Sequence, residues 1–249
     1  MIKLAYIQKK NGEFLSEAAY SFWKGCDALG IDTVGFEQDA GIDDLEVTKE
    51  TVVYGGIGTV RKAFTKLGVP QPTVGEMPPA EVLPFYGRRL WATTMLEVRY
   101  GYEDNKFFFI KPLREHKAFG GHVTSPSIGS LALTARFPDN FEILASEVMY
   151  FKSEYRLFIH QGKIRDSRFY RGDFRHSPDY TVADRFLEAI QKPPVAYSLD
   201  LGVTDDGQTF VVEVNDAFSL GHYGMPHTPY ASMVIDRWEE IVGGTPESL

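Results

Sequence analysis

The segment AYSLDLGVTDDGQTFVVEVN, residues 196–215, decides which fold the chain can adopt. Two runs of alternating apolar residues flank Asp206-Gly207, a dipeptide typical of a two-residue type I′ turn. In that hairpin Asp200 lies directly opposite Glu213, and Asn215 shares the face of Glu213. The sequence therefore predicts two antiparallel strands with one acidic and one apolar face. The apolar face is expected to consist of Tyr197, Leu199, Leu201, Phe210, Val212 and Val214.

Two facing carboxylates repel each other unless the face is open to water, one group is protonated, or a cation lies between them. Two carboxylates and an amide oxygen form a hard, oxygen-only ligand set, which suits Mg²⁺ that also binds water and phosphate oxygens. The acidic face is therefore either a magnesium site formed by Asp200, Glu213 and Asn215 or a solvent-facing sheet surface. The register matters, because a three-residue loop would turn Asp200 to the opposite face.

Short strands and helices alternate over the first third of the chain. The apolar stripe of residues 16–29 predicts a helix with Ser16 as N-cap, and Cys26 on that stripe is interpreted as a core residue. A second helix is expected over 58–67, ended by Gly68. Strands are expected over 2–7, 32–37 and 51–54. The alternation predicts a small α/β domain over 1–75.

A proline-rich connector spans residues 70–84 and separates this domain from a β-rich second domain over 76–249. Residues 118–130 are predicted to be a flexible Gly/Ser loop. A helix is expected over 181–192, with a capping box formed by Thr181 and Asp184. Strands are expected over 106–113, 141–151, 153–160 and 163–170.

Composition narrows the class of protein. The 249 residues are 43% hydrophobic and 24% charged, which excludes a disordered chain, and a single cysteine excludes an internal disulfide. The net charge of -8 disfavours general nucleic-acid binding. No apolar run approaches the roughly 20 residues that span a bilayer, and early charges interrupt any secretory signal, so we expect a cytoplasmic protein without membrane contact. A basic stretch over 152–175 indicates either a small anionic ligand or a salt-bridged sheet face.

The common catalytic motifs are absent from the sequence. Ile31 stands where a phosphate-binding P-loop requires lysine, and Arg61 replaces the last glycine of a dinucleotide fingerprint. No GxSxG, HExxH or CxxC is present, which argues against the usual hydrolases, zinc proteases and zinc ribbons.

Several short motifs occur together in residues 85–235: IKP at 110–112, SEYR at 153–156, SLD at 198–200 and VVEVNDAFSLG at 211–221. In this order they resemble the ATP-grasp superfamily, most closely a compact clade of phage and bacterial ligase-like proteins. The resemblance implies an α/β (α+β) fold in which two α+β subdomains hold ATP, preceded by a small α/β domain. Two positions depart from the family pattern. Asp216 stands where a small residue is usual, and Arg88 or Arg89 stands in place of an upstream lysine.

The resemblance also implies roles for individual residues. Lys111 is expected at adenine or the α-phosphate, Lys117 with the 118–130 loop at the β- and γ-phosphates, and Glu154 at the ribose. The backbone of the connector 146–149 is expected to meet adenine. The implied ATP-binding residues are Lys111, Lys117, Glu147, Val148, Met149, Glu154 and Arg156. The implied catalytic residues are Arg156, Lys117 and Arg168, and the implied Mg²⁺ ligands are Asp200, Glu213 and Asn215.

The function implied is an ATP- and Mg²⁺-dependent, ADP-forming ligase that joins a small-molecule or peptide carboxylate to an amine through an acylphosphate. Two alternatives use the same residues. One is a nucleotide-binding regulatory or interaction module without turnover, and the other is an ATP-dependent phosphotransferase. We expect the acceptor pocket to draw on Arg165, Arg168, Tyr170, Arg171, His222 and Tyr223.

Overall fold

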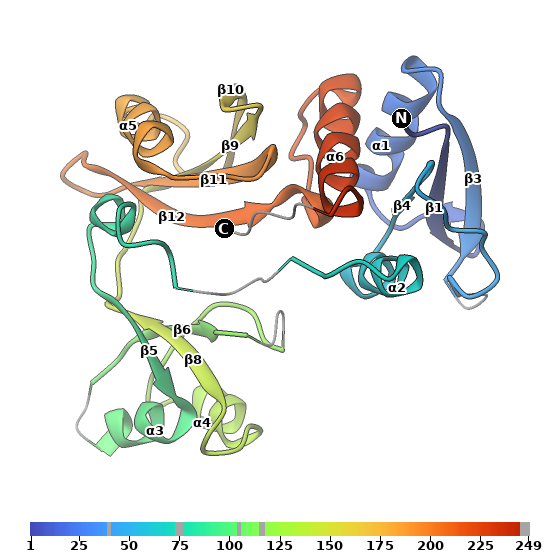
Figure 1. The fold of residues 1–249 in the computed structure, drawn as a ribbon. Helices are drawn as coiled ribbons and strands as arrows, with labels where there is room; N and C mark the ends of the chain where they lie inside the picture. The colour runs from blue at the N-terminus through green and yellow to red at the C-terminus, as the bar shows by residue number, and fades with distance from the viewer. Residues whose placement is uncertain (39–40, 73–76, 104–105, 115–117, 245–249) are drawn as a thin grey trace.

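The computed structural model describes residues 1–38, 41–72, 77–103, 106–114 and 118–244. The strands of these residues form three four-stranded sheets, each with its own hydrophobic cluster (Figure 1). No helix in the described ranges combines the length and apolarity that crossing a bilayer requires.

The first sheet is centred on β1 (Leu4–Lys10), which pairs in parallel with β3 (Asp32–Glu37) and β4 (Thr51–Tyr54) and antiparallel with β2 (Glu13–Phe14). The predicted strands of this region are thereby confirmed. The predicted helices are confirmed as α1 (Glu17–Ala28) and α2 (Ile57–Leu67).

The ends of these two helices follow from local chemistry. The Ser16 hydroxyl accepts from the Ala19 amide at 3.2 Å and caps α1, and Gly68 ends α2 with a left-handed φ of 67°. Cys26 is completely buried on α1, and burial raises the pKa of its thiol to about 12, which agrees with its interpretation as a core residue.

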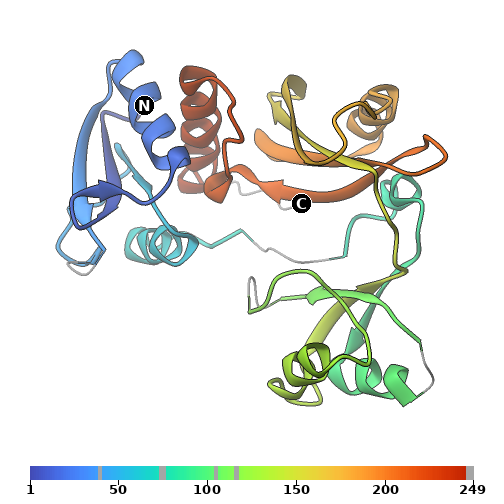
Figure 2. The ribbon, with the colours of Figure 1, turned by 180° about the vertical axis from the view of Figure 1, so that it is seen from behind.

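The core of this first unit is completed by a helix from the other end of the chain. Helix α6 (His227–Val242) lies between the first sheet and the last sheet in both ribbon views (Figures 1 and 2). Its Tyr230 and Trp238 are buried in the same cluster as Phe22 of α1, and the Tyr230 and Tyr54 hydroxyls lie 2.8 Å apart. The sequence analysis did not predict this helix.

Helix α1 approaches α6 closely at Gly25, where an added Cβ would overlap the His227 carbonyl and the Ala231 side chain. We expect Gly25→Ala to lower the free energy of unfolding by about 1–3 kcal/mol, because overpacking outweighs the better helix propensity of alanine. Gly58→Ala is the matched control, since a Cβ there meets open space in α2. Urea unfolding of both variants tests this, and equal stability of the two would contradict the close contact.

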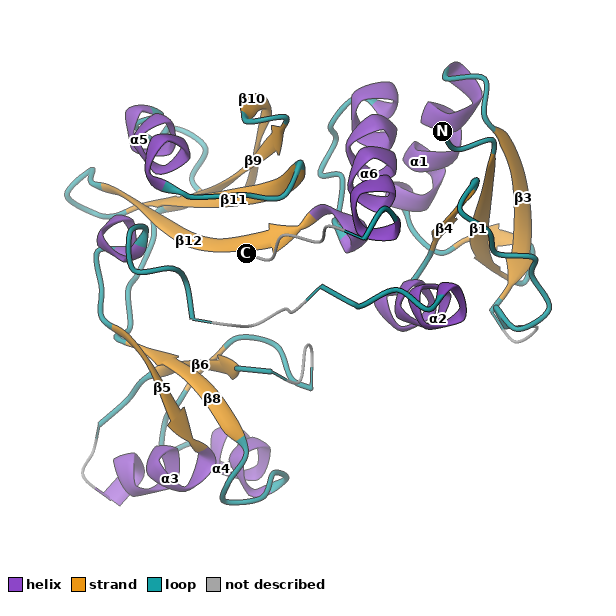
Figure 3. Cartoon of the chain, viewed as in Figure 1, coloured by secondary structure: helices purple, strands orange, loops and turns teal. Residues whose placement is uncertain are grey.

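The second sheet has the order β5 (Leu90–Thr94), β8 (Glu142–Ser146), β6 (Phe109–Pro112) and β7 (His122–Val123), all antiparallel. Helices α3 (Met95–Glu103) and α4 (Ile128–Ala135) lie on one side of it (Figure 3). The prediction of a flexible loop over 118–130 is wrong for β7 and for the start of α4. The Ser130 hydroxyl lies 2.8 Å from both Tyr102 Oη and His122 Nε2, which ties this segment to its neighbours.

The third sheet has the order β10 (Lys163–Gly172), β9 (Ser153–His160), β11 (Ala196–Val203) and β12 (Thr209–Asp216), again all antiparallel. Helix α5 (Thr181–Ala189) and the short 3-10 helix η1 (Leu83–Tyr86) pack on its apolar face through Phe186, Val82 and Tyr86. The predicted hairpin about Gln161-Gly162 is confirmed, with left-handed φ values of 53° and 68°.

The helix prediction over 181–192 is wrong in its details. Helix α5 ends at Ala189, and it has no side-chain cap at Tyr180. The Asp179 carboxylate accepts from the Thr181 amide at 3.0 Å, so the polar start lies two residues earlier than the predicted Thr181/Asp184 box.

The turn of the β11–β12 hairpin also differs from the prediction. The Thr204 amide donates to the Gln208 carbonyl at 2.9 Å, so the loop contains three residues, Asp205 to Gly207, with a left-handed φ of 80° at Gly207. A bulge at Val212 then shifts the register between Leu201 and Asp200. The two irregularities cancel, and Asp200 pairs with Glu213 as predicted.

The bulge changes which residues of β12 reach the core. Val211 is fully buried in the cluster, whereas the sequence analysis expected Phe210 and Val212 there. Tyr197, Leu199 and Leu201 of β11 are buried as predicted.

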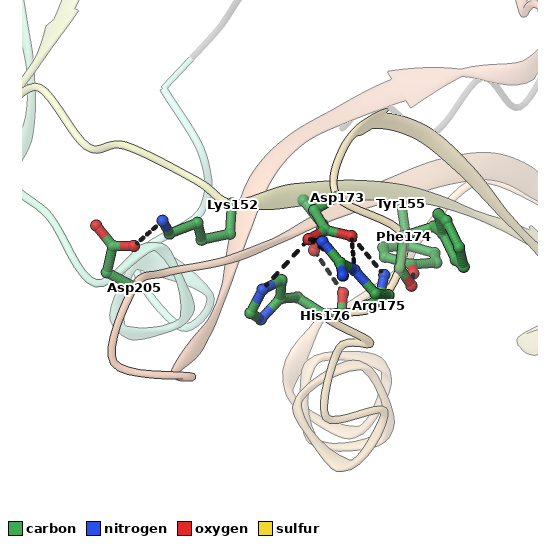
Figure 4. Close-up of polar contacts among 8 residues, drawn as sticks. Lys152, Tyr155, Asp173, Phe174, Arg175, His176 and Asp205 are labelled. Carbon is green, nitrogen blue, oxygen red and sulfur yellow. Dashed lines mark hydrogen bonds and ion pairs between the residues drawn. The ribbon is translucent and has the colours of Figure 1, made fainter.

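Polar contacts fix the loops that surround this hairpin (Figure 4). Lys152 Nζ lies 2.7 Å from Asp205 Oδ1 and so links the segment before β9 to the β11–β12 turn. The Tyr155 hydroxyl donates to the Phe174 carbonyl at 2.8 Å, and the segment after β10 is further held by an ion pair between Arg175 and Asp173 at 2.7 Å.

Candidate active site

One transverse row of charged residues crosses the polar face of the third sheet. Arg168 of β10 pairs with Arg156 of β9, Arg156 pairs with Asp200 of β11, and Asp200 pairs with Glu213 of β12. Directly paired residues project from the same face of a sheet, so the register brings four predicted site residues together.

The centre of the row is a buried ion pair. Arg156 Nε donates to Asp200 Oδ1 at 2.8 Å, and Arg156 Nη2 donates to Asp200 Oδ2 at 2.7 Å. The side chains are only 8% and 1% exposed, respectively. Such a two-point pair fixes both the position and the plane of the guanidinium.

The carboxyl of this pair is strongly perturbed. Burial raises the pKa of Asp200 to about 6, the bonds to Arg156 oppose that rise, and the charges of Glu213 and Glu154 add to it. Three carboxylates around one site favour the binding of a cation.

The raised pKa predicts how stability depends on pH. Between its ordinary value of 3.8 and about 6, the Asp200 carboxyl binds more protons in the folded chain than in the unfolded chain. Its contribution to the free energy of unfolding therefore falls as the pH rises through this interval and is constant above it. We expect the difference in unfolding free energy between the wild type and Asp200→Asn, measured by urea unfolding, to decrease from pH 4 to 6. A difference that grows over this interval would overturn the assignment.

The acidic end of the row carries the other two predicted metal ligands. Asn215 Nδ2 donates to Glu213 Oε1 at 3.0 Å, and that same oxygen lies 3.9 Å from Arg156 Nη2. Glu213 is 38% exposed, so its carboxylate is open to a ligand. Two carboxylates and an amide fit Mg²⁺ by the hardness of their oxygens. Among the described residues, no group of three His, Cys, Asp or Glu side chains could hold a metal without such an amide.

Glu154 does not pair with Arg156, although the two residues lie two apart on β9. Its carboxylate accepts from the Tyr170 hydroxyl at 2.8 Å and from Arg171 Nη1 at 2.8 Å. At the other end of the row, Arg168 donates through Nε and Nη2 to Asp166 Oδ2, at 2.8 and 2.6 Å. The basic stretch is therefore largely paired with carboxylates of its own strand pair.

Lys111 of β6 belongs to the second sheet but senses the acidic row. Burial lowers the pKa of its ammonium, and the charge of Glu213 partly restores it. Lys117 lies outside the described residues, so its predicted role stays a prediction.

Arg88 is a site residue for which the sequence contains only a weak signal, the missing upstream lysine. Its Nη1 and Nη2 donate to the Val211 and Val212 carbonyls, each at 2.9 Å. The guanidinium thus binds the backbone at the bulge that places Glu213. The charges of Glu154 and Glu213 act on the pKa of Arg88 as well, which locates it beside the row.

The predicted adenine connector joins β8 to β9. The Glu147 amide donates to the Arg89 carbonyl at 3.2 Å, and its carboxylate accepts from the Arg89 amide at 2.9 Å. Within the described part of the chain, no backbone hydrogen bond engages Val148 or Met149. Their amide and carbonyl groups are of the kind that can recognise the edge of a base.

Comparison with known proteins identifies the family. A model of the ATP-grasp domain, clade family 2, matches residues 85–233, which is more than half of the 249-residue chain. A search of curated proteins found no match.

Solved structures share the fold over nearly the whole chain. D-cycloserine synthetase DcsG is 14% identical with a TM-score of 0.57, covering 94% of this chain and 99% of its own. D-alanine–D-alanine ligase from Bacillus anthracis complexed with ATP is 14% identical with a TM-score of 0.55, covering 96% and 98%. The ATP-grasp ligase PsnB complexed with a minimal precursor is 11% identical with a TM-score of 0.54, covering 95% and 100%.

These likenesses extend to the α/β unit at the N-terminus as well as to the two sheets that follow it. The fold is an α/β ATP-grasp fold, as the resemblance implied. With the family model spanning both the second and the third sheet, the chain belongs to the ATP-grasp superfamily, in the clade that this model describes.

Proposed function

We propose that the chain is an ADP-forming carboxylate–amine ligase that uses ATP and Mg²⁺. The observation that carries the proposal is the row Arg156–Asp200–Glu213, where a fixed guanidinium adjoins an oxygen-only ligand set on one sheet face. Phosphoryl transfer requires positioning and charge neutralisation more than covalent catalysis by the protein, and this row supplies both.

The nucleotide would lie between the second and third sheets. The unbonded backbone of Val148 and Met149, next to Glu147, supports adenine recognition. Lys111 is placed to contact the adenine edge or the α-phosphate, and Glu154 to accept from the ribose. Lys117 and the segment after it are assigned to the β- and γ-phosphates.

Asp200, Glu213 and Asn215 would hold Mg²⁺, and the Mg²⁺ neutralises charge on the phosphate oxygens when it is bound. Asp200 uses one direction on each of its oxygens for Arg156, and a carboxylate has further lone pairs for a cation. Arg156 keeps this carboxylate ionised against the effect of burial.

In the proposed reaction, an oxygen of the substrate carboxylate attacks the γ-phosphorus, and the bond from that phosphorus to the β-phosphate oxygen breaks to release ADP. The amine nitrogen then attacks the carbonyl carbon of the acylphosphate. The carbon–oxygen bond to phosphate breaks, and inorganic phosphate and a proton leave. Arg156 and Arg168 are the proposed donors to the transferring and acceptor groups. The acid is a small molecule or a peptide, and the partner is an amine.

Calorimetric titration with ATP and Mg²⁺ tests the metal assignment. We expect Glu213→Ala to weaken Mg²⁺-dependent ATP binding at least tenfold, because it removes a charged ligand. Glu188→Ala, on the exposed face of α5, is the matched control and should bind like the wild type. Equal binding by wild type and Glu213→Ala would remove Glu213 from the metal site.

ADP release with mixtures of acids and amines tests turnover. Release that requires both an acid and an amine supports the ligase. Release with a hydroxyl compound alone points to a phosphotransferase. Tight ATP binding without release in any mixture favours the regulatory module.

A further inference from the structure

Tyr223, on the loop between η2 (Ala217–Ser219) and α6, covers the face of the Arg156 guanidinium. The Arg156 Cζ atom lies 4.6 Å from the centroid of the Tyr223 ring, within the range of a cation–π contact. Tyr170 of β10 approaches the same guanidinium at 6.0 Å, and the two tyrosine rings lie 5.4 Å apart. Two aromatic rings thus adjoin the cation that Asp200 holds by its edge.

The backbone of Tyr223 is in a conformation that bulky residues rarely adopt. Its φ is 46°, in the left-handed region, and the following Gly224 also has a positive φ of 83°. The Met225 amide donates to the His222 carbonyl at 2.8 Å and closes the turn around it. A large side chain held in a costly conformation indicates a function for that side chain, since asparagine or glycine would fit this backbone better.

One nitrogen of Arg156 remains available in this arrangement. Asp200 takes Nε and Nη2, and Nη2 also faces Glu213. Among the described residues, none hydrogen-bonds Nη1, and this atom is not enclosed away from solvent. Nη1 is therefore the donor that a ligand can use, and its direction depends on the plane of the guanidinium.

We propose that Tyr223 is a positioning residue that fixes the plane of Arg156 and aims Nη1 at the γ-phosphate. This role rests on the proposed function, because it presumes that the nucleotide binds beside Arg156. Asp200 restrains the guanidinium within its plane, and the Tyr223 ring restrains tilting out of that plane. The ring is 46% exposed, so its outer side is open toward solvent.

Two substitutions separate this role from a purely structural one. Tyr223→Asn removes the ring but suits the left-handed backbone, and Tyr223→Phe keeps the ring without the hydroxyl. The measurements are the affinities for AMP-PNP and for ADP, each with Mg²⁺, and the midpoint of thermal unfolding. The ratio of the two affinities reports the contact with the γ-phosphate and needs no turnover.

We expect the wild type and Tyr223→Phe to prefer AMP-PNP to the same extent. Tyr223→Asn should lose about tenfold of that preference, in the range for a lost cation–π contact, while its unfolding midpoint stays equal or rises. Where ADP release is measurable, kcat should fall with little change in the KM for ATP.

The outcomes distinguish this inference from the proposed function. A wild type that binds neither nucleotide overturns both. A Tyr223→Asn variant that keeps the wild-type preference overturns the role of Tyr223 alone. A variant whose unfolding midpoint and affinities for both nucleotides all fall together shows a structural role instead and equally overturns the proposal.

Discussion

Arg156→Lys is expected to lower ADP release about 100- to 1,000-fold while ATP still binds. Lysine keeps the positive charge, but it cannot make the two-point contact with Asp200 and still present a further nitrogen in the same plane. The expected loss matches that of one preorganised donor to a developing negative charge. Steady-state ADP release with a fixed acid and amine, together with ATP titration, measures the two effects separately.

Arg175→Lys provides the matched control for this experiment. Arg175 also pairs with an aspartate, Asp173, but it lies on the exposed segment after β10 (Figure 4). We expect this variant to turn over like the wild type. A result in which Arg156→Lys retains more than half of the wild-type rate would exclude Arg156 from the reaction, provided that circular dichroism shows the variant folded.

The second large effect is expected on stability. Arg237 of α6 is fully buried and donates through Nε and Nη2 to Asp216 at 2.9 and 2.6 Å, and through Nη1 to Glu240 at 2.6 Å. Arg237→Met would leave the Asp216 carboxylate buried without this partner. We expect the free energy of unfolding to fall by about 3–5 kcal/mol, measured by urea unfolding at pH 7.

A double variant tests whether the unpaired charge causes that loss. Asp216→Asn combined with Arg237→Met removes both charges, and we expect it to be more stable than Arg237→Met alone. Arg185→Met, on the exposed side of α5, should change stability by no more than about 0.5 kcal/mol. A loss below about 1 kcal/mol for Arg237→Met would show that the triad does not stabilise the fold.

The same triad accounts for a departure from the family pattern. Asp216 follows Glu213 and Asn215 but pairs with Tyr197, whose side chain lies in the apolar core. Its carboxylate therefore points away from the acidic face. Its partner is 21 residues further along the chain, on a helix that the sequence analysis did not predict. No local pattern could reveal this pairing.

Local signals predicted most of the strands and the pairing of Asp200 with Glu213. They succeeded because alternation and turn residues act within a few positions. The register was right although the turn was wrong, since the three-residue loop and the bulge at Val212 compensate. The bulge is supported by Arg88, from a segment more than 120 residues away, which no hairpin rule includes.

Helix α6 escaped prediction for a related reason. It packs on α1 and also contacts the third sheet, so buried residues surround most of its circumference, including Tyr230, Met233, Arg237 and Trp238. A helix buried on several sides lacks the single apolar stripe by which helices are recognised. The partnership of Arg156 with Asp200 was missed similarly, because it depends on β9 and β11 being neighbours.

The placement of α6 has a consequence for synthesis of the protein. The unit that emerges first from the ribosome, β1 to α2, lacks Trp238, Ile241 and Val242 from its interior until translation nears its end. Its apolar surface has to wait for that last helix, so the first and last parts of the chain become stable together rather than in order of emergence.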